Sequence, residues 1–160
     1  MTFRLALLAP LCCSLVILPR APAFADGAAS VDKPGKAQQR IDRSGKARKG
    51  KASYYARRFA GRKMANGERM NPGSNAAASR TLPLGTRAKV TNLRNGKSAD
   101  VEIKDRGPYV QGRTIDLTPQ TAESLGMKHE GVAPVEVAPI EVPQPDGTMK
   151  AGEAAAQNES

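Results

Sequence analysis

The stretch TRAKVTNLRNGKSADVEIKD, residues 86–105, decides how this chain folds. In each half of the stretch, small or apolar residues alternate with polar ones, and Val90, Val101 and Ile103 fall on the apolar faces. Strict alternation of this kind is typical of half-buried strands. Asn95 and Gly96 between the halves form the dipeptide most typical of a two-residue hairpin turn. The stretch therefore predicts two antiparallel strands.

Other segments extend this pattern into a mainly β domain with one short helix. Strand character recurs in residues 51–56, 113–119 and 132–142. The segment TPQTAESLG reads as a brief helix with Thr118 as its N-cap, Pro119 at its first position and Gly126 at its end. Many short strands with one small helix favour a compact β-barrel, which leaves no exposed sheet edge.

Residues 1–25 have the features of a secretory signal peptide. A short basic start precedes an apolar run, and Ala23 and Ala25 give the small-x-small pattern of a cleavage site. A membrane span is the alternative, but the run is shorter than the roughly 20 residues that a span needs. A lipoprotein is the second alternative, because Cys12 and Cys13 lie inside the run. Cleavage after Ala25 would remove both cysteines and leave the mature chain without a disulfide.

Composition divides the rest of the chain into three parts. Residues 26–49 are basic and nearly free of large apolar side chains, so we expect a flexible linker. Residues 50–142 hold the barrel, and residues 143–160 are expected to form a disordered tail. The whole chain has a formal net charge of +10. Such a charge suits an anionic partner, but the export signal and the low aromatic content disfavour nucleic acid.

Two carboxylates in loops are candidates for acid–base chemistry. Asp105 ends the strand 98–105 and precedes a Gly-Pro turn, which suits a residue that faces a groove. Glu68 lies in the motif NGER within a Gly- and Asn-rich loop. Cleavage of a glycosidic bond commonly uses two carboxyl groups, although one can serve as acid and then as base. The alternatives are a turn Asp that bonds its own backbone and a solvated Glu.

Other polar and aromatic residues allow two interpretations each. Asp116 alternates with apolar residues, which favours a buried structural carboxylate over a third wall of the groove. Tyr54, Tyr55 and Tyr109 could stack on sugar rings or fill the core. His129 is the only histidine of the chain, and one histidine does not make a zinc site. We therefore expect His129 to lie in a loop.

Six motifs in one order and spacing resemble the bacterial RlpA-like (rare lipoprotein A) family. They are GKASYYA, ANGE, RTLPLGT, VTNLRNGK, DRGPY and IDLT. The resemblance covers about residues 50–142. It implies a six-stranded double-psi β-barrel with one or two short helices.

The resemblance also implies an activity, a lytic transglycosylase acting on peptidoglycan glycan strands. Such an enzyme cleaves the MurNAc–GlcNAc β-1,4 bond without water and leaves 1,6-anhydroMurNAc ends. By position, Asp105 corresponds to the acid/base and Glu68 to a second acidic residue of the groove. The implied substrate-binding residues are Asn66, Asn71, Ser79, Arg80, Arg106 and Tyr109. The resemblance implies no metal and no cofactor.

Two positions depart from the family pattern. Ser79 replaces a histidine in AASRTLP, and Asn71 replaces an aspartate three residues after the glutamate of the GE pair. These changes remove an imidazole and a negative charge from the expected groove. The second hypothesis is therefore an expansin-like barrel that binds peptidoglycan without cleaving it. A protease inhibitor or a secreted effector remains a third class.

The expectations for location and assembly follow from these segments. We expect an exported monomer in the periplasm or cell envelope, with peptidoglycan glycan strands as its partner. Neither a nucleic acid partner nor a stable membrane span is expected.

Overall fold

The hairpin predicted from residues 86–105 is confirmed by the computed structural model, which describes residues 40–157. β3 (Arg87–Asn92) and β4 (Ser98–Asp105) pair antiparallel, so that Ala88 lies opposite Val101. Val101 and Ile103 point into the core, and Glu102 between them does not. The predicted signal peptide and most of the predicted linker lie outside the described residues.

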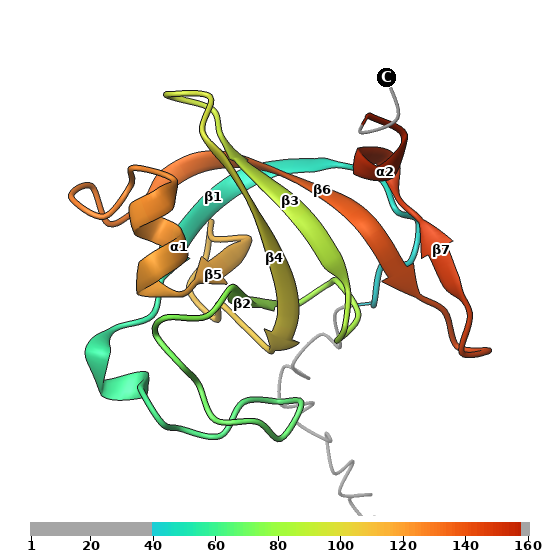
Figure 1. Cartoon of the computed structure of the whole chain (residues 1–160), viewed down its shortest axis with the longest axis horizontal. Helices are drawn as coiled ribbons and strands as arrows, with labels where there is room; N and C mark the ends of the chain where they lie inside the picture. The colour runs from blue at the N-terminus through green and yellow to red at the C-terminus, as the bar shows by residue number, and fades with distance from the viewer. Residues whose placement is uncertain (1–39, 158–160) are drawn as a thin grey trace, which may run out of the picture. The chain divides into compact units, whose positions relative to one another are not determined.

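Six strands close into a barrel (Figure 1). The other four are β1 (Arg48–Tyr54), β2 (Ala76–Ser79), β5 (Ile115–Leu117) and β6 (Ala133–Pro143). The strand order is β1-β5-β2-β4-β3-β6, and β6 pairs with β1 to complete the circle. The pairs β1–β5 and β2–β4 are parallel, and the remaining pairs are antiparallel. The predicted mainly β barrel is therefore confirmed.

Alternating residues of these strands fill the barrel. The largest fully buried apolar side chains of the strands are Val90, Val101, Ile103, Ile115, Leu117, Val135 and Val142, and the segment after α1 adds Leu125 and Met127. Each such side chain contributes roughly 1.5–3 kcal/mol when it leaves water. Pro139 lies opposite the register shift between Arg87 and Ala88, which is the kind of irregular position that a proline within a sheet occupies.

Helices contribute little to the fold. α1 (Pro119–Ser124) begins as predicted, because the Thr118 side chain accepts a hydrogen bond from the Thr121 backbone N–H at 3.4 Å. A short 3-10 turn, η1 (Arg57–Phe59), follows β1. None of the helices formed by residues 40–157 has the length and apolar character needed to cross a bilayer.

β2 differs from the sequence prediction, which placed residues 65–81 outside the strands. Alanine is depleted in strands, so the run Ala76–Ala78 carries no strand signal of its own. Tertiary pairing supplies the order, since β2 lies between β4 and β5 and all of its residues are buried. Ala77 faces the barrel core, whereas Ala76 and Ala78 face a second apolar cluster with Tyr55, Met64 and Met70.

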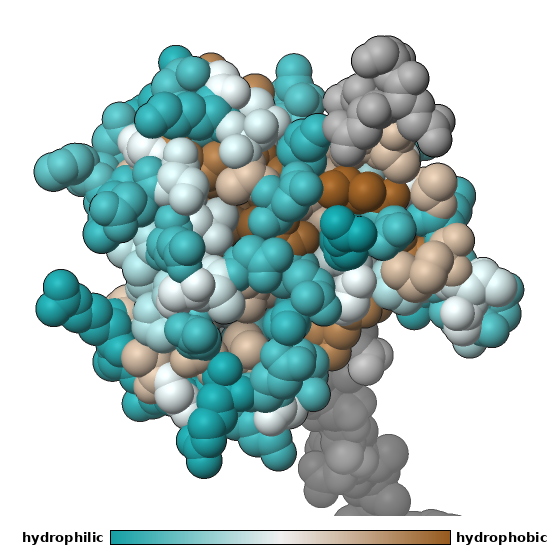
Figure 2. All heavy atoms as spheres, in the orientation of Figure 1, coloured by the Kyte–Doolittle hydropathy of each residue, from teal (hydrophilic) through white to brown (hydrophobic). Residues whose placement is uncertain are grey.

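The C-terminal segment also differs from the predicted disordered tail. β7 (Met149–Ala151) pairs with β6, and α2 (Glu153–Gln157) follows it and buries Ala154 completely. Figure 2 shows hydrophobic surface where β6 meets α2, and further hydrophobic surface over the middle of the barrel. The polar composition of this segment hides the small apolar contacts, such as that of Ala154, that order it. β1 likewise begins two residues inside the predicted linker.

Candidate active site

β2 brings two carboxyl groups to one face of the barrel. Ala78 is paired with Asp105 of β4 on one side and with Asp116 of β5 on the other. Residues paired across neighbouring strands project from the same face of a sheet. Both carboxyls therefore lie on the outer face, where Ala78 packs against Tyr55 and the second apolar cluster. The small side chain of Ala78 places no bulky group between them.

Asp105 is fixed by three hydrogen-bond donors. The Tyr55 hydroxyl donates to Oδ2 at 3.0 Å, the Ala65 N–H donates to Oδ1 at 2.9 Å, and the Arg106 N–H donates to Oδ1 at 2.8 Å. The register between β2 and β4 shifts here, since Ala77 pairs with Ile103 but Ala78 pairs with Asp105. Such irregularities often redirect a side chain beside an active site.

Asp116 is half-buried and differs electrostatically from an ordinary surface aspartate. The Ser53 hydroxyl donates a hydrogen bond to its Oδ1, and Arg113 Nη1 donates to Ser53 Oγ at 3.3 Å. Burial raises the pKa of Asp116 and the charge of Asp105 raises it further, while Ser53 and Arg113 act in the opposite direction. Asp116 is therefore a half-buried, hydrogen-bonded carboxylate, as its alternation with apolar residues indicated. It also lies close to Asp105.

Tyr55 remains a hydrogen-bond donor under ordinary conditions. Burial raises the pKa of its hydroxyl far above the usual value, and the charge of Asp105 adds to this effect. The phenol is consequently neutral at any physiological pH. From the sequence, Tyr55 was expected only to stack on sugars or to fill the core, and Ser53 and Arg113 were not predicted as site residues. Their role depends on pairings between distant strands, which left no local signal.

Glu68 lies near the end of β4 but is engaged in an ion pair. Its Oε2 lies 3.0 Å from Lys104 Nζ, and this contact lowers the pKa of the carboxyl. The Asn66 N–H donates to the Lys104 carbonyl at 3.0 Å, which holds the loop against β4. Glu68 is thus an exposed, ionised carboxylate beside Lys104, the residue that precedes Asp105 in β4.

Both predicted asparagines shape the loop that precedes β2. Asn66 Oδ1 accepts from the Glu68 N–H at 3.0 Å, and Asn71 Oδ1 accepts from the Gly73 N–H at 2.9 Å. Each is an Asx turn, in which the side chain replaces a backbone acceptor. Both residues are solvent-exposed.

Three other predicted residues contact the backbone around the end of β2. Ser79 is only 2% exposed, and its Oγ accepts from the Leu82 N–H at 3.2 Å and the Thr81 N–H at 3.4 Å. Arg106 Nη1 donates to the carbonyls of Ser79 and Leu82. Arg80 Nη2 donates to the Arg113 carbonyl at 3.4 Å. These contacts stabilise the turn after β2.

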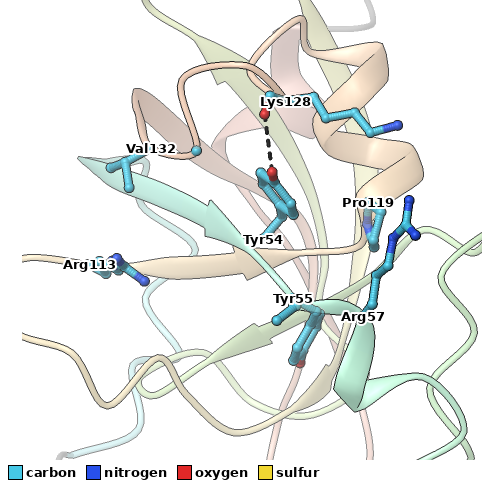
Figure 3. Close-up of a pocket in the computed structure, with 9 residues that line it drawn as sticks. Tyr54, Tyr55, Arg57, Arg113, Pro119, Lys128 and Val132 are labelled. Atoms are coloured by element: carbon cyan, nitrogen blue, oxygen red, sulfur yellow. Dashed lines mark hydrogen bonds between the residues drawn. The ribbon is translucent and has the colours of Figure 1, made fainter.

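Aromatic side chains lie on the loop after β4 and in a pocket that Tyr55 lines. Tyr109, on the loop after β4, is 79% exposed. A pocket of about 550 Å³ has Tyr54, Tyr55, Arg57 and Arg113 among its lining residues. In Figure 3, Arg57 and Arg113 lie on opposite sides of the two tyrosines. His129 lies in the turn after α1, as expected, and is exposed.

These features define a double-psi β-barrel protein with two neighbouring carboxyls beside an aromatic and cationic pocket. Residues 47–137 match the family model described as "Lytic transglycolase". The chain belongs to this family, and the resemblance inferred from the six motifs is confirmed.

Curated relatives match over the barrel. The chain is 56% identical over 90 residues to "Probable endolytic peptidoglycan transglycosylase RlpA" of Nostoc sp., which is 55% of this chain and 24% of that protein. It is 46% identical over 99 residues to "Endolytic peptidoglycan transglycosylase RlpA" of Pasteurella multocida, covering 62% and 34%. The chain thus spans about a quarter to a third of the length of these relatives. The expansin of Clavibacter michiganensis matches with a TM-score of 0.45 and 19% identity, over 59% of this chain and 50% of that one.

Proposed function

We propose that this chain is a lytic transglycosylase that cleaves peptidoglycan glycan strands at the MurNAc–GlcNAc β-1,4 bond. The observation that carries the proposal is the placement of Asp105 and Asp116 on either side of Ala78, with Tyr55 bonded to Asp105. The family and the names of its relatives support the same reaction class and a location in the cell envelope.

The reaction needs one proton to be given and one to be taken. An acid protonates the glycosidic oxygen, and the bond from MurNAc C1 to that oxygen breaks to give an oxocarbenium-like transition state. The MurNAc 6-hydroxyl then forms a bond to C1 and gives up its proton, which closes the 1,6-anhydro ring. Water is not consumed, and the net proton transfer runs from the 6-oxygen to the leaving oxygen.

Asp105 is the proposed acid/base, and Asp116 is its proton-holding partner. Burial raises the pKa of Asp116, and the negative charge of Asp105 beside it adds to this effect. Asp116 therefore holds a proton at a higher pH than a surface aspartate would. The three donors to Asp105 keep its carboxyl in place during both transfers.

Glu68 is assigned a binding role. Because Lys104 lowers the pKa of Glu68, this carboxyl stays ionised and is a poor proton donor. An exposed carboxylate beside Lys104 can accept hydrogen bonds from sugar hydroxyls. Asn66, Asn71 and Tyr109 would contact the same glycan strand.

The test is mass spectrometry of peptide-free glycan strands after incubation with the protein. Wild type is expected to release fragments with 1,6-anhydroMurNAc ends. Asp105→Asn should abolish these products, Asp116→Asn should reduce them at least about 100-fold, and Glu68→Gln should mainly raise KM. Hydrolytic products with reducing MurNAc ends, or full activity in Asp105→Asn, would refute the proposed mechanism.

A glycan-binding barrel without turnover is the second candidate. Ser79 and Asn71 favour it, because the hydroxyl of Ser79 is committed to the backbone and Asn71 has no charge. Binding of strands by wild type without any anhydro product would support this alternative.

A further inference from the structure

The pocket beside the carboxyl pair is positively charged. Arg57 reaches it from η1, Arg113 from the segment before β5, and Lys128 from the turn after α1. No Asp or Glu is among its lining residues. A volume of about 550 Å³ falls in the range of small-molecule sites.

Arg57 is the most available of the three cations, since Arg113 already donates to Ser53 and acts electrostatically on Asp116. Lys128 Nζ lies 2.9 Å from Glu123 Oε2, so its charge is already compensated. Neither Arg57 nor Arg113 forms a salt bridge within residues 40–157. Guanidinium groups bind carboxylates through charge-assisted, often bidentate, hydrogen bonds. The pocket is therefore suited to an anionic group.

Hydrogen bonds link residues of the pocket to both carboxyls of the site. Tyr55 lines it and donates its hydroxyl to Asp105. Arg113 lines it and donates to Ser53, whose hydroxyl donates to Asp116. A group bound in the pocket would consequently contact Tyr55 and Arg113, the two lining residues that are linked by hydrogen bonds to the carboxyl pair.

We infer that this pocket binds the carboxylate carried on the lactyl arm of MurNAc, an inference that rests on the function proposed above. MurNAc and GlcNAc differ only in this arm, which is attached to O3 of the MurNAc ring. In peptide-free strands the lactyl carboxylate is free, and in other strands the arm continues into a stem peptide with carboxylates of its own. Both sources offer the same chemistry to Arg57 and Arg113.

Such a subsite would set the register of cleavage. The glycan alternates two nearly identical sugars, so a barrel that binds only hydroxyls and ring faces would accept either sugar at the carboxyl pair. Only MurNAc brings an anion. Its capture in the pocket places the anomeric carbon of MurNAc, and not that of GlcNAc, beside Asp105.

The experiment measures binding separately from turnover. The full chain carries Asp105→Asn to prevent cleavage, and Arg57→Gln is added to remove one guanidinium from the pocket. Arg58→Gln is the matched control, because Arg58 belongs to the same η1 turn, packs 5.1 Å from the Phe59 ring centre and does not line the pocket. Arg113 is left unchanged because it contacts Ser53.

Three strands of equal length serve as probes. They are peptide-free strands with free lactyl carboxylates, the same strands with these carboxylates converted to methylamides, and strands that retain stem peptides. The parent should bind the free-carboxylate strands about five- to tenfold more tightly than the methylamides, as expected for a charge-assisted contact. Arg57→Gln should abolish the difference, and Arg58→Gln should preserve it.

The strands with stem peptides distinguish the source of the carboxylate. Binding as tight as to the free-carboxylate strands assigns a carboxylate of the peptide, and weaker binding assigns the lactyl group itself. Equal affinity of the parent for free and methylamidated strands would overturn the inference, as would an equal loss in Arg57→Gln and Arg58→Gln. The proposed function is judged separately, from the anhydro products of wild type.

Discussion

Tyr55 shows how a single side chain connects the parts of the candidate site. Its ring packs against Met64 and Met70 in the second apolar cluster, its hydroxyl donates to Asp105, and it lines the cationic pocket. Packing fixes the ring, and the raised pKa keeps the hydroxyl protonated. A donor held in this way stabilises charge without having to reorient when substrate enters.

The raised pKa of Asp116 predicts a pH dependence of stability. The folded state binds a proton at Asp116 more tightly than the unfolded state, so this residue's contribution is complete below its ordinary pKa of 3.8. The contribution is lost as the pH rises through the higher folded pKa. Asn cannot ionise, so Asp116→Asn should gain stability relative to wild type across that window. Urea unfolding of both proteins from pH 3 to pH 8 measures the difference. A constant difference over this range would contradict the assignment.

Substitution of Ser79 should lower the free energy of unfolding of the protein in the absence of any ligand. Its buried Oγ accepts two backbone hydrogen bonds in the turn after β2, so Ser79→Ala leaves the Leu82 and Thr81 N–H groups without this acceptor. The expected loss in the free energy of unfolding is about 1 kcal/mol. The exposed Ser98, at the start of β4, provides the control, and Ser98→Ala should change stability by less than about 0.5 kcal/mol. Similar values for the two variants would remove the structural role from Ser79.

At the scale of elements, β2 organises the site although it is the strand with the least sequence signal. Its alanines let β4 and β5 carry Asp105 and Asp116 to the same face without an intervening bulky side chain. Ala77 turns inward and is fully buried, so the strand also contributes to the barrel core.

The close packing of β2 predicts that enlargement is costly. Ala77→Leu adds three carbon atoms inside the closed barrel and should reduce the free energy of unfolding by about 1–3 kcal/mol. The matched control is Ala151→Leu on the exposed β7, where a change below about 0.5 kcal/mol is expected. Thermal or urea denaturation of the two variants measures both values. Tolerance of leucine at position 77 would mean that the core beside β2 is looser than its burial indicates.

The elements show which parts of this molecule are predictable from local pattern. β4 was predicted with its observed bounds, because alternation around Val101 and Ile103 and the Asn95-Gly96 turn are local signals. β2 was missed, because its order comes from β4 and β5, which are distant in sequence. Asp105 was recognised from its motif, whereas its contact with Tyr55 depends on packing across the barrel.

At the scale of the whole molecule, the two ends of the described chain contact each other beside the barrel. The Glu153 N–H donates to the Gly45 carbonyl at 2.9 Å, and Glu153 Oε2 accepts from the Ala47 N–H at 2.8 Å. Arg48 and Asp42 form an ion pair at 2.7 Å in the same N-terminal segment. These contacts hold α2 against β6 and the start of β1. Neither Asp105 nor Asp116 takes part in them.

Gly152 is the position on which this arrangement depends. A Cβ at this residue would lie 2.2 Å from the Pro139 carbonyl oxygen and 2.6 Å from its carbon, and both are backbone atoms of β6. Gly152→Ala should therefore displace β7 and α2 and break the hydrogen bond from the Gly152 N–H to the Ile140 carbonyl. Faster trypsin cleavage at Lys150 and faster hydrogen exchange at residues 152–153 are the expected results.

The same substitution should leave the barrel closed, since β6 still pairs with β1. Release of anhydro products should accordingly stay within about twofold of wild type, because neither Asp105 nor Asp116 contacts the displaced segment. Ala151→Ser, at the exposed neighbouring position, is the control and should retain wild-type cleavage at Lys150. Cleavage at the wild-type rate in Gly152→Ala would mean that β6 accommodates the methyl group. Loss of catalytic activity in that variant would instead reveal a coupling between α2 and the site.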